Sequence, residues 1–181
     1  IRENDIEKKP VANNNILYAG RVSKEKGVEE LISSFLEMEN KTFTLKILGT
    51  GPELENLKNR YRNEKSIIFL GSLDNENTLH IISTSIAVIT ATKMLEGQPT
   101  LLSEASSLGV PSIFPDSSGI SEYFPKEYPL KFKQFDYSDL KLKLEMLNDR
   151  DFMSIMGYEV LNYFNQNFSR EKYLDKFSKI L

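Results

Sequence analysis

Short apolar runs alternate along the chain with longer segments whose apolar residues recur at helical spacing. The short runs predict buried strands, because a strand covered on both faces lacks regular polar positions. The predicted strands are residues 15–20, 43–49, 66–71, 86–92 and 111–115, with a weaker one at 128–132. The predicted helices are residues 26–39, 52–63, 75–85, 99–109 and 139–149, followed by a helical tail over 151–181.

This alternation predicts an α/β fold. Strand–helix–strand units are right-handed and build a mainly parallel sheet with helices on both faces. Within the tail, Ser169 is a suitable N-cap for a last helix. Residues 1–14 are polar and resemble a linker, so we expect the folded domain to span residues 15–181. The chain opens with Ile1 in that linker-like segment, and we expect it to be a piece of a longer protein.

Composition narrows the function only by exclusion. The chain has 181 residues, of which 40% are hydrophobic and 27% charged, as in an ordinary soluble globular domain. Its net charge of −3 provides no overall field for nucleic acid, so a local cationic patch must hold any anionic ligand. The absence of cysteine excludes disulfides, thiolate nucleophiles and cysteine metal sites, and it fits a cytoplasmic protein. No metal-ligand cluster is visible in the sequence.

The loops that follow the strands carry the candidate chemistry, because ligands of open α/β sheets bind beyond the carboxyl ends of the strands. The first loop places Arg21, Lys24 and Lys26 just before a predicted helix. Cations beside a helix N-terminus suit phosphate oxygens, although a solvated surface cluster explains them equally well. The second loop contains Gly49-x-Gly51, for which a tight turn is the favoured interpretation, since the third glycine of a dinucleotide-binding fingerprint is missing.

Two acids lie around the start of the predicted helix 99–109. Glu96 precedes the helix, where the helix dipole favours a carboxylate, and Glu104 lies inside it among small and apolar residues. Burial of an unpaired carboxylate is costly, so Glu104 is expected to have a partner. The hydroxyl groups of a sugar or a ribose are suitable donors, and the unpaired amides of the first helical turn add further donors for a ligand.

The third loop offers Leu73 as a floor for a nucleobase, although Asp74 and Asn75 explain the same segment as a helix cap. The segment around Ser118-Gly119 predicts a turn followed by a short helical turn, with a weaker claim to line the same cleft. The single histidine, His80, lies in the middle of a predicted helix and is interpreted as structural.

Taken in order, the segments GRVSKEKG, LKILGTGPELENL, FLGSLDN and EGQPTLLSEASSLGVPSIF closely resemble the C-terminal, donor-binding domain of GT-B glycosyltransferases. The closest class is the retaining group called family 4, or glycosyl transferases group 1. The resemblance runs from about Asn15 to the end, and the spacing Glu-x7-Glu of Glu96 and Glu104 is its most specific element. It implies one half of a GT-B fold, that is, a Rossmann-like doubly wound parallel sheet with a helical C-terminal tail.

The resemblance also implies roles for individual residues. Arg21 and Lys26 would hold the diphosphate of a nucleotide-diphosphate sugar, with UDP or GDP as the nucleotide, and would stabilise the charge that develops as it leaves. Glu96 would bind hydroxyls of the transferred sugar, so these three residues are the expected catalytic set. Glu104 would bind the ribose. The remaining expected donor-binding residues are Gly20, Leu73, Gly97, Gln98, Pro99, Thr100 and Leu101.

On the same basis, the parent protein is expected to be a hexosyltransferase-type enzyme that transfers its sugar with retention to a polysaccharide, lipid or other acceptor. No cofactor and no metal are expected. The expected partners are the nucleotide sugar and an N-terminal acceptor domain that this chain lacks, with peripheral membrane association through that domain at the inner face of the membrane. This chain alone is expected to bind nucleotide without transferring sugar.

The sequence departs from the family pattern at two places. Gln98 and Pro99 stand where family members often have an aromatic residue or Gly, and Ser118-Gly119 replaces a Gly-Gly pair. Two alternatives remain open. The first is a non-catalytic nucleotide-binding or partner-docking module, which the intact set of cations and acids disfavours. The second is a sugar-nucleotide epimerase of the same fold, which the lone mid-helix histidine disfavours.

Overall fold

A computed structural model of the chain describes residues 13–39, 42–97, 99–117 and 119–168. The predicted helix beginning at Ser169 therefore lies outside the described residues, as do residues 1–12 of the predicted linker. Within the described ranges, no helix combines the length and the apolar character needed to cross a bilayer.

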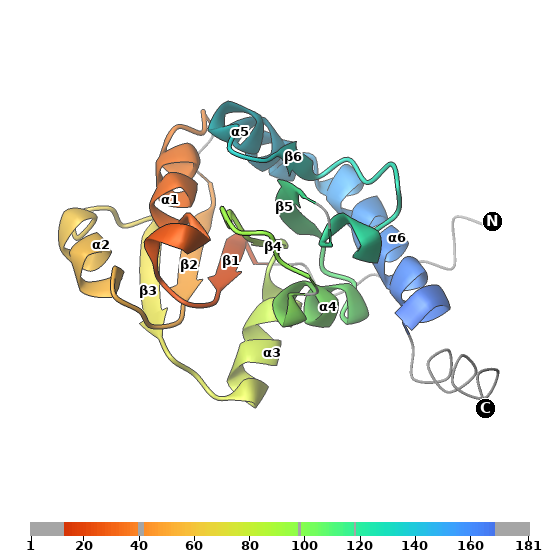
Figure 1. Ribbon diagram of the computed structural model, residues 1–181, viewed down its shortest axis with the longest axis horizontal. Helices are drawn as coiled ribbons and strands as arrows, with labels where there is room; N and C mark the ends of the chain where they lie inside the picture. The colour runs from red at the N-terminus through yellow and green to blue at the C-terminus, as the bar shows by residue number, and fades with distance from the viewer. Residues whose placement is uncertain (1–12, 40–41, 98, 118, 169–181) are drawn as a thin grey trace.

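A six-stranded sheet in the order β3-β2-β1-β4-β5-β6 forms the centre of the protein (Figure 1). Its strands are β1 (Asn15–Ala19), β2 (Thr44–Leu48), β3 (Ile67–Gly71), β4 (Ala87–Ile89), β5 (Ser112–Asp116) and β6 (Lys131–Lys133). Each neighbouring pair is parallel, and Leu17 in β1 pairs with Lys46 on one side and Val88 on the other. The strand order reverses between β1 and β4, as in a Rossmann-like doubly wound sheet, so the predicted fold class is confirmed.

Helices cover both faces of this sheet. They are α1 (Val28–Leu36), α2 (Leu54–Arg60), α3 (Asn75–Thr84), α4 (Thr100–Ser107), α5 (Tyr137–Glu145) and α6 (Arg150–Phe168). Helices α1 and α5 pack against each other on one side, whereas α4 packs against α3 and α6 on the other (Figure 1). In α1, Leu31, Ile32 and Phe35 are buried at helical spacing, which is the stripe that fastens the helix to the sheet.

Two strand predictions differ from the structure in extent. The strand predicted at 86–92 keeps ladder pairing only over β4, so Thr92 already belongs to the loop beyond it. The weak strand predicted at 128–132 begins instead at Lys131. The Tyr128 hydroxyl is buried, where it accepts a hydrogen bond from the Ser112 amide at 3.0 Å, and Pro129 has no amide to donate to a ladder.

Candidate functional site

The loops that follow β1 and β4 meet at the point where the strand order reverses. A short 3-10 helix, η1 (Lys24–Lys26), ends at Gly27, whose φ of +66° is in the left-handed region. A methyl group on Gly27 would lie 2.0 Å from the carbonyl oxygen of Ala91, so only glycine allows this approach of the two loops. The Lys93 amide also donates to the Glu25 carbonyl at 2.9 Å. The two loops therefore form one packed unit.

The central contact of this unit is an ion pair between Lys26 and Glu96. Both side chains are partly buried, with exposed fractions of 28% for Lys26 and 19% for Glu96. The Thr92 hydroxyl donates to Oε1 of Glu96 at 2.8 Å and accepts a hydrogen bond from the Met94 amide at 3.2 Å. The structure thus brings together two of the predicted catalytic residues and orients the carboxylate of Glu96 through Thr92.

Arg21 is linked to the same centre through its backbone. The buried Tyr18 hydroxyl donates to the Arg21 carbonyl at 2.7 Å. Burial raises the pKa of Tyr18, and the negative charges of Glu96 and Glu25 raise it further. Tyr18 therefore remains a neutral donor that anchors the first loop, and the Arg21 side chain extends into solvent at the carboxyl edge of the sheet.

Helix α4 begins at Thr100 with Pro99 as its N-cap, one residue after the start of the predicted helix 99–109. The Pro99 carbonyl accepts hydrogen bonds from the amides of Leu102 and Ser103 at 3.1 and 3.3 Å. Pro99 has no amide hydrogen and so offers no backbone donor, and the donor-binding roles of Gly97, Pro99, Thr100 and Leu101 stay predictions. Gln98 lies outside the described residues.

Glu104 lies on α4, where its side chain is half-buried. Burial raises the pKa of its carboxyl group, and none of the ion pairs among the described residues includes it. Its environment thus matches the expectation of a partly desolvated acid. Its predicted role as a ribose ligand stays a prediction.

The two outer loops contribute less. Leu73 is 39% exposed beyond β3, and Asp74 caps α3 by accepting a hydrogen bond from the Asn77 amide at 2.8 Å. The cap interpretation is confirmed, while the contact of Leu73 with a nucleobase stays a prediction. Gly119, with φ of +98°, packs on the backbone of Glu96, since a methyl group there would lie 2.3 Å from the Glu96 carbonyl oxygen. The neighbouring Ser118 lies outside the described residues.

The glycines of the second loop support the first loop. The Gly20 amide donates to the Leu48 carbonyl and the Val22 amide donates to the Thr50 carbonyl, both at 2.9 Å. A methyl group on Gly49 would lie 1.9 Å from the Gly20 carbonyl oxygen, and one on Gly51 would lie 2.2 Å from the Val22 carbonyl oxygen, so the two glycines allow the close approach of the loops.

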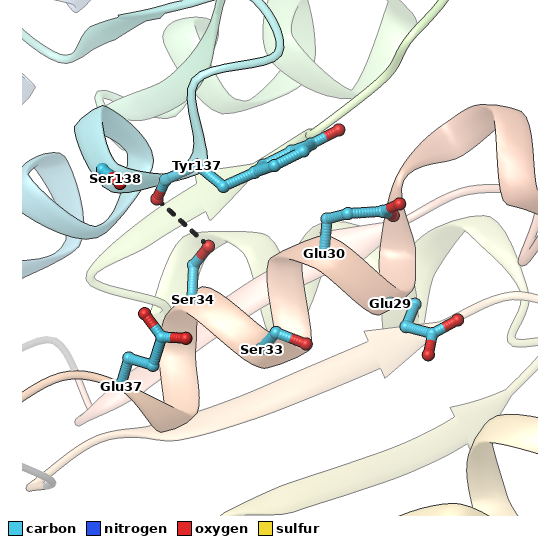
Figure 2. A pocket seen from close by; sticks show the side chains of 7 residues that line it. All are labelled: Glu29, Glu30, Ser33, Ser34, Glu37, Tyr137 and Ser138. Atoms are coloured by element: carbon cyan, nitrogen blue, oxygen red, sulfur yellow. Dashed lines mark hydrogen bonds between the residues drawn. The ribbon is translucent and has the colours of Figure 1, made fainter.

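A groove between α1 and α5 was not predicted from the sequence (Figure 2). Figure 2 shows Glu30 beneath the ring of Tyr137 at one end and Glu37 at the other, while the Ser34 hydroxyl donates to the Tyr137 carbonyl at 3.3 Å. Among the residues that the structure describes, no group of three or more acids or histidines is arranged to hold a metal ion. Three glutamates, Glu29, Glu30 and Glu37, line the groove, so it is an acidic surface.

Sequence reasoning also missed Thr92, Lys93 and Glu30. Lys93 follows Thr92 in the loop beyond β4 and forms an ion pair with Glu30 of α1. The position of Thr92 and Lys93 directly after a strand is the feature that could have identified them, because chemistry concentrates at such loops.

Comparison with known proteins identifies the family of the chain. The family model described as "Glycosyl transferases group 1" matches residues 2–159. An uncharacterized glycosyltransferase of Methanocaldococcus jannaschii is 24% identical over 172 residues, which are 91% of this chain and 44% of that protein. The chain spans less than half the length of the curated relatives it matches.

Solved structures with ligands share the fold. The pneumococcal O-GlcNAc transferase GtfA, solved in complex with UDP and GlcNAc, matches with a TM-score of 0.79 and 20% identity over 96% of this chain and 36% of that chain. Anabaena HepE, solved in complex with UDP and glucose, matches with a TM-score of 0.78 and 16% identity over 92% of this chain and 48% of that chain. The described sheet and helices therefore have the architecture of one half of a GT-B fold.

Proposed function

Because the chain belongs to the glycosyl transferases group 1 family, we propose that it is the nucleotide-sugar-binding half of a GT-B glycosyltransferase. The observation that carries this proposal is the Lys26–Glu96 ion pair at the strand-order reversal. It places a cation suited to phosphate beside an acid suited to sugar hydroxyls, at the position where doubly wound sheets bind ligands. UDP in two solved structures of similar fold supports a uridine or related nucleotide.

The donor would lie along the edge formed by the first loop and α4. Its diphosphate would contact Arg21, Lys26 and the amides at the start of α4, since a helix N-terminus favours anions. The transferred sugar would lie at Glu96, and the ribose at Glu104, whose half-buried carboxylate would accept hydrogen bonds from hydroxyls. Leu73, exposed beyond β3, is the proposed contact of the base.

In the proposed reaction, the bond between the anomeric carbon and the diphosphate oxygen breaks, and an acceptor hydroxyl forms a new bond to that carbon on the same face. The nucleotide diphosphate leaves with the bonding electrons and takes up the proton of the acceptor hydroxyl. Arg21 and Lys26 would lower the barrier by stabilising the negative charge that develops on the leaving group. Glu96 would hold the sugar while the bond breaks.

The other half of the enzyme is proposed to be an N-terminal acceptor domain. It would supply the acceptor site, and with it any association with the cytoplasmic face of a membrane. We also propose that donor binding requires no metal, because Arg21, Lys26 and the start of α4 provide positive charge where other enzymes use a divalent cation. Equal affinity for UDP with and without a chelator would support this, and loss of binding with the chelator would contradict it.

Calorimetric titration of UDP and of GDP into the chain tests the proposed function. We expect one of the two nucleotides to bind at a single site. If circular dichroism shows a folded protein and neither nucleotide binds, the assignment of this domain as the donor half is wrong.

A further inference from the structure

A second ion pair joins the same two segments as the Lys26–Glu96 pair, with its charges reversed. Lys93, from the loop beyond β4, contacts Glu30 of α1. The exposed fractions are 33% for Lys93 and 30% for Glu30, so both side chains are partly buried. The hydrogen bond from its ammonium group to Glu30 raises the pKa of Lys93. Each segment thus gives one cation and one acid to its neighbour.

Helix α5 covers this second pair. Burial raises the pKa of Tyr137, the negative charge of Glu30 raises it further, and the positive charge of Lys93 lowers it. Figure 2 shows the Tyr137 ring above Glu30 at the end of the groove between α1 and α5. Glu30 therefore meets Lys93 in a place bounded by two helices.

The segment that carries Glu96 has little apolar anchoring of its own. Met94 and Leu95, between Lys93 and Glu96, are 46% and 76% exposed. Thr92 is buried at the start of the segment, and Gly119 packs on the Glu96 backbone. The other described contacts that attach the segment are polar, namely the Lys93 amide on the Glu25 carbonyl and the two ion pairs. A loop that buries few apolar groups opens locally with ease, so its position depends on such contacts.

We propose that Lys93 and Glu30 are positioning residues for the sugar-binding acid. Their ion pair holds residues 92–97 against α1, and this contact keeps Glu96 beside Lys26. Lys93 lies three residues before Glu96, and its charge is satisfied by Glu30 rather than by the ligand. The role in sugar binding rests on the proposed function; the role in holding the loop does not.

Amide hydrogen exchange tests the holding role without a ligand. We expect the amides of Lys93 and Met94 to exchange roughly two- to fivefold faster in Lys93→Met and in Glu30→Gln, the range expected from a partly exposed ion pair. Glu29→Gln is the matched control, because the neighbouring Glu29 pairs with Arg60 of α2 and has similar exposure. If both variants exchange like the control, the inference is overturned.

Calorimetry with UDP, UDP-glucose and UDP-GlcNAc tests the positioning role. We expect Lys93→Met and Glu30→Gln to lose roughly two- to fivefold in affinity for the nucleotide sugar that the wild type binds, with UDP affinity unchanged. Lys93→Arg should retain both affinities, because it preserves the cation. A loss of UDP affinity in Lys93→Met but not in Glu30→Gln would instead make Lys93 a phosphate ligand and overturn the positioning role.

The two experiments separate the inference from the proposed function. If the wild type binds none of the three ligands, the proposed function fails for uridine nucleotides, whereas the exchange rates still decide whether the pair holds the loop. If the wild type binds a nucleotide sugar, and Lys93→Met and Glu30→Gln lose affinity for it but not for UDP, the proposed function and the positioning role are both supported.

Discussion

Lys26 and Glu96, which are 70 residues apart in the sequence, form an ion pair across the strand-order reversal of the sheet. Each charge would be costly in a partly buried site if the other were missing. The pairing also brings together the two chemical functions that a nucleotide sugar requires, a cation for the diphosphate and an acid for sugar hydroxyls. Mutation of Lys26 should therefore weaken binding of the diphosphate, whereas mutation of Glu96 or of the groups that orient it should weaken binding of the sugar.

Replacement of Lys26 by alanine should weaken UDP binding by at least about tenfold, because a charge-assisted hydrogen bond contributes about 1.5–3 kcal/mol. Arg21→Ala is expected to act in the same direction. Lys24→Ala is the matched control, since Lys24 is an exposed cation of the same loop and should change the affinity less than about twofold. Calorimetry measures all three, and equal losses in Lys24→Ala and Lys26→Ala would point to a general charge effect.

Thr92→Val should lower the affinity for a nucleotide sugar by roughly three- to tenfold while UDP affinity is retained. The valine removes the hydroxyl that donates to Glu96, whereas side-chain volume and branching are preserved. Thr92→Ser keeps the hydroxyl and is expected to bind like the wild type. An equal loss of UDP and nucleotide-sugar affinity in Thr92→Val would show that Thr92 supports the whole loop rather than the sugar-binding acid.

Gly27→Ala should destabilise the protein by at least about 3 kcal/mol, because its methyl group meets the Ala91 carbonyl oxygen in addition to the left-handed backbone. Gly71→Ala is the matched control, since Gly71 has a φ of +70° with nothing within 4 Å of the added carbon. It should cost only the backbone term of about 1–2 kcal/mol. Urea unfolding measures the free energy of unfolding of both variants. Equal losses in Gly27→Ala and Gly71→Ala would mean that the loops beyond β1 and β4 can move apart without cost.

The sequence predicts the layers of the fold well, because those layers follow from local patterns. The runs that became β1 to β5 are short and mainly apolar, although Ile68 of the edge strand β3 is 40% exposed. Pro99 marks the start of α4 in the sequence as in the structure. The weak strand near residue 130 was misplaced, because its start depends on the packing of Tyr128 against Ser112 rather than on any local pattern.

Side-chain pairing across the sheet is the part that local patterns cannot provide. The family resemblance placed Lys26 and Glu96 in one site, and the ion pair confirms that they are neighbours. The pairing of Lys93 with Glu30, 63 residues away, follows from the approach of two loops that only the folded sheet defines. A lysine and a glutamate at such a distance in a chain with many of both give no sequence pattern to detect.

Glu104→Gln should stabilise the chain at neutral pH and weaken UDP binding. Burial raises the pKa of Glu104 above its usual value of 4.5, so the folded chain holds this proton more tightly than the unfolded chain. Stability therefore falls as pH rises from that value through the raised one, which leaves a deficit on the alkaline side. Glutamine removes the deficit, and the gain should be less than about 1 kcal/mol because the half-buried carboxylate is partly screened by solvent.

Urea unfolding at pH 3.5 and pH 7 measures this gain, which should appear only at the higher pH, and Glu127→Gln, which changes an exposed acid, should show none. Calorimetry on the same variant should show UDP affinity reduced by about tenfold, because a neutral amide accepts a weaker hydrogen bond from a ribose hydroxyl than a carboxylate does. A variant that is more stable but binds UDP more weakly is the result expected for a ligand-binding acid, because burial of its carboxylate has a cost that only the bound ligand offsets. A stabilised variant with unchanged UDP affinity would show that Glu104 is buried for another reason and that the ribose lies elsewhere.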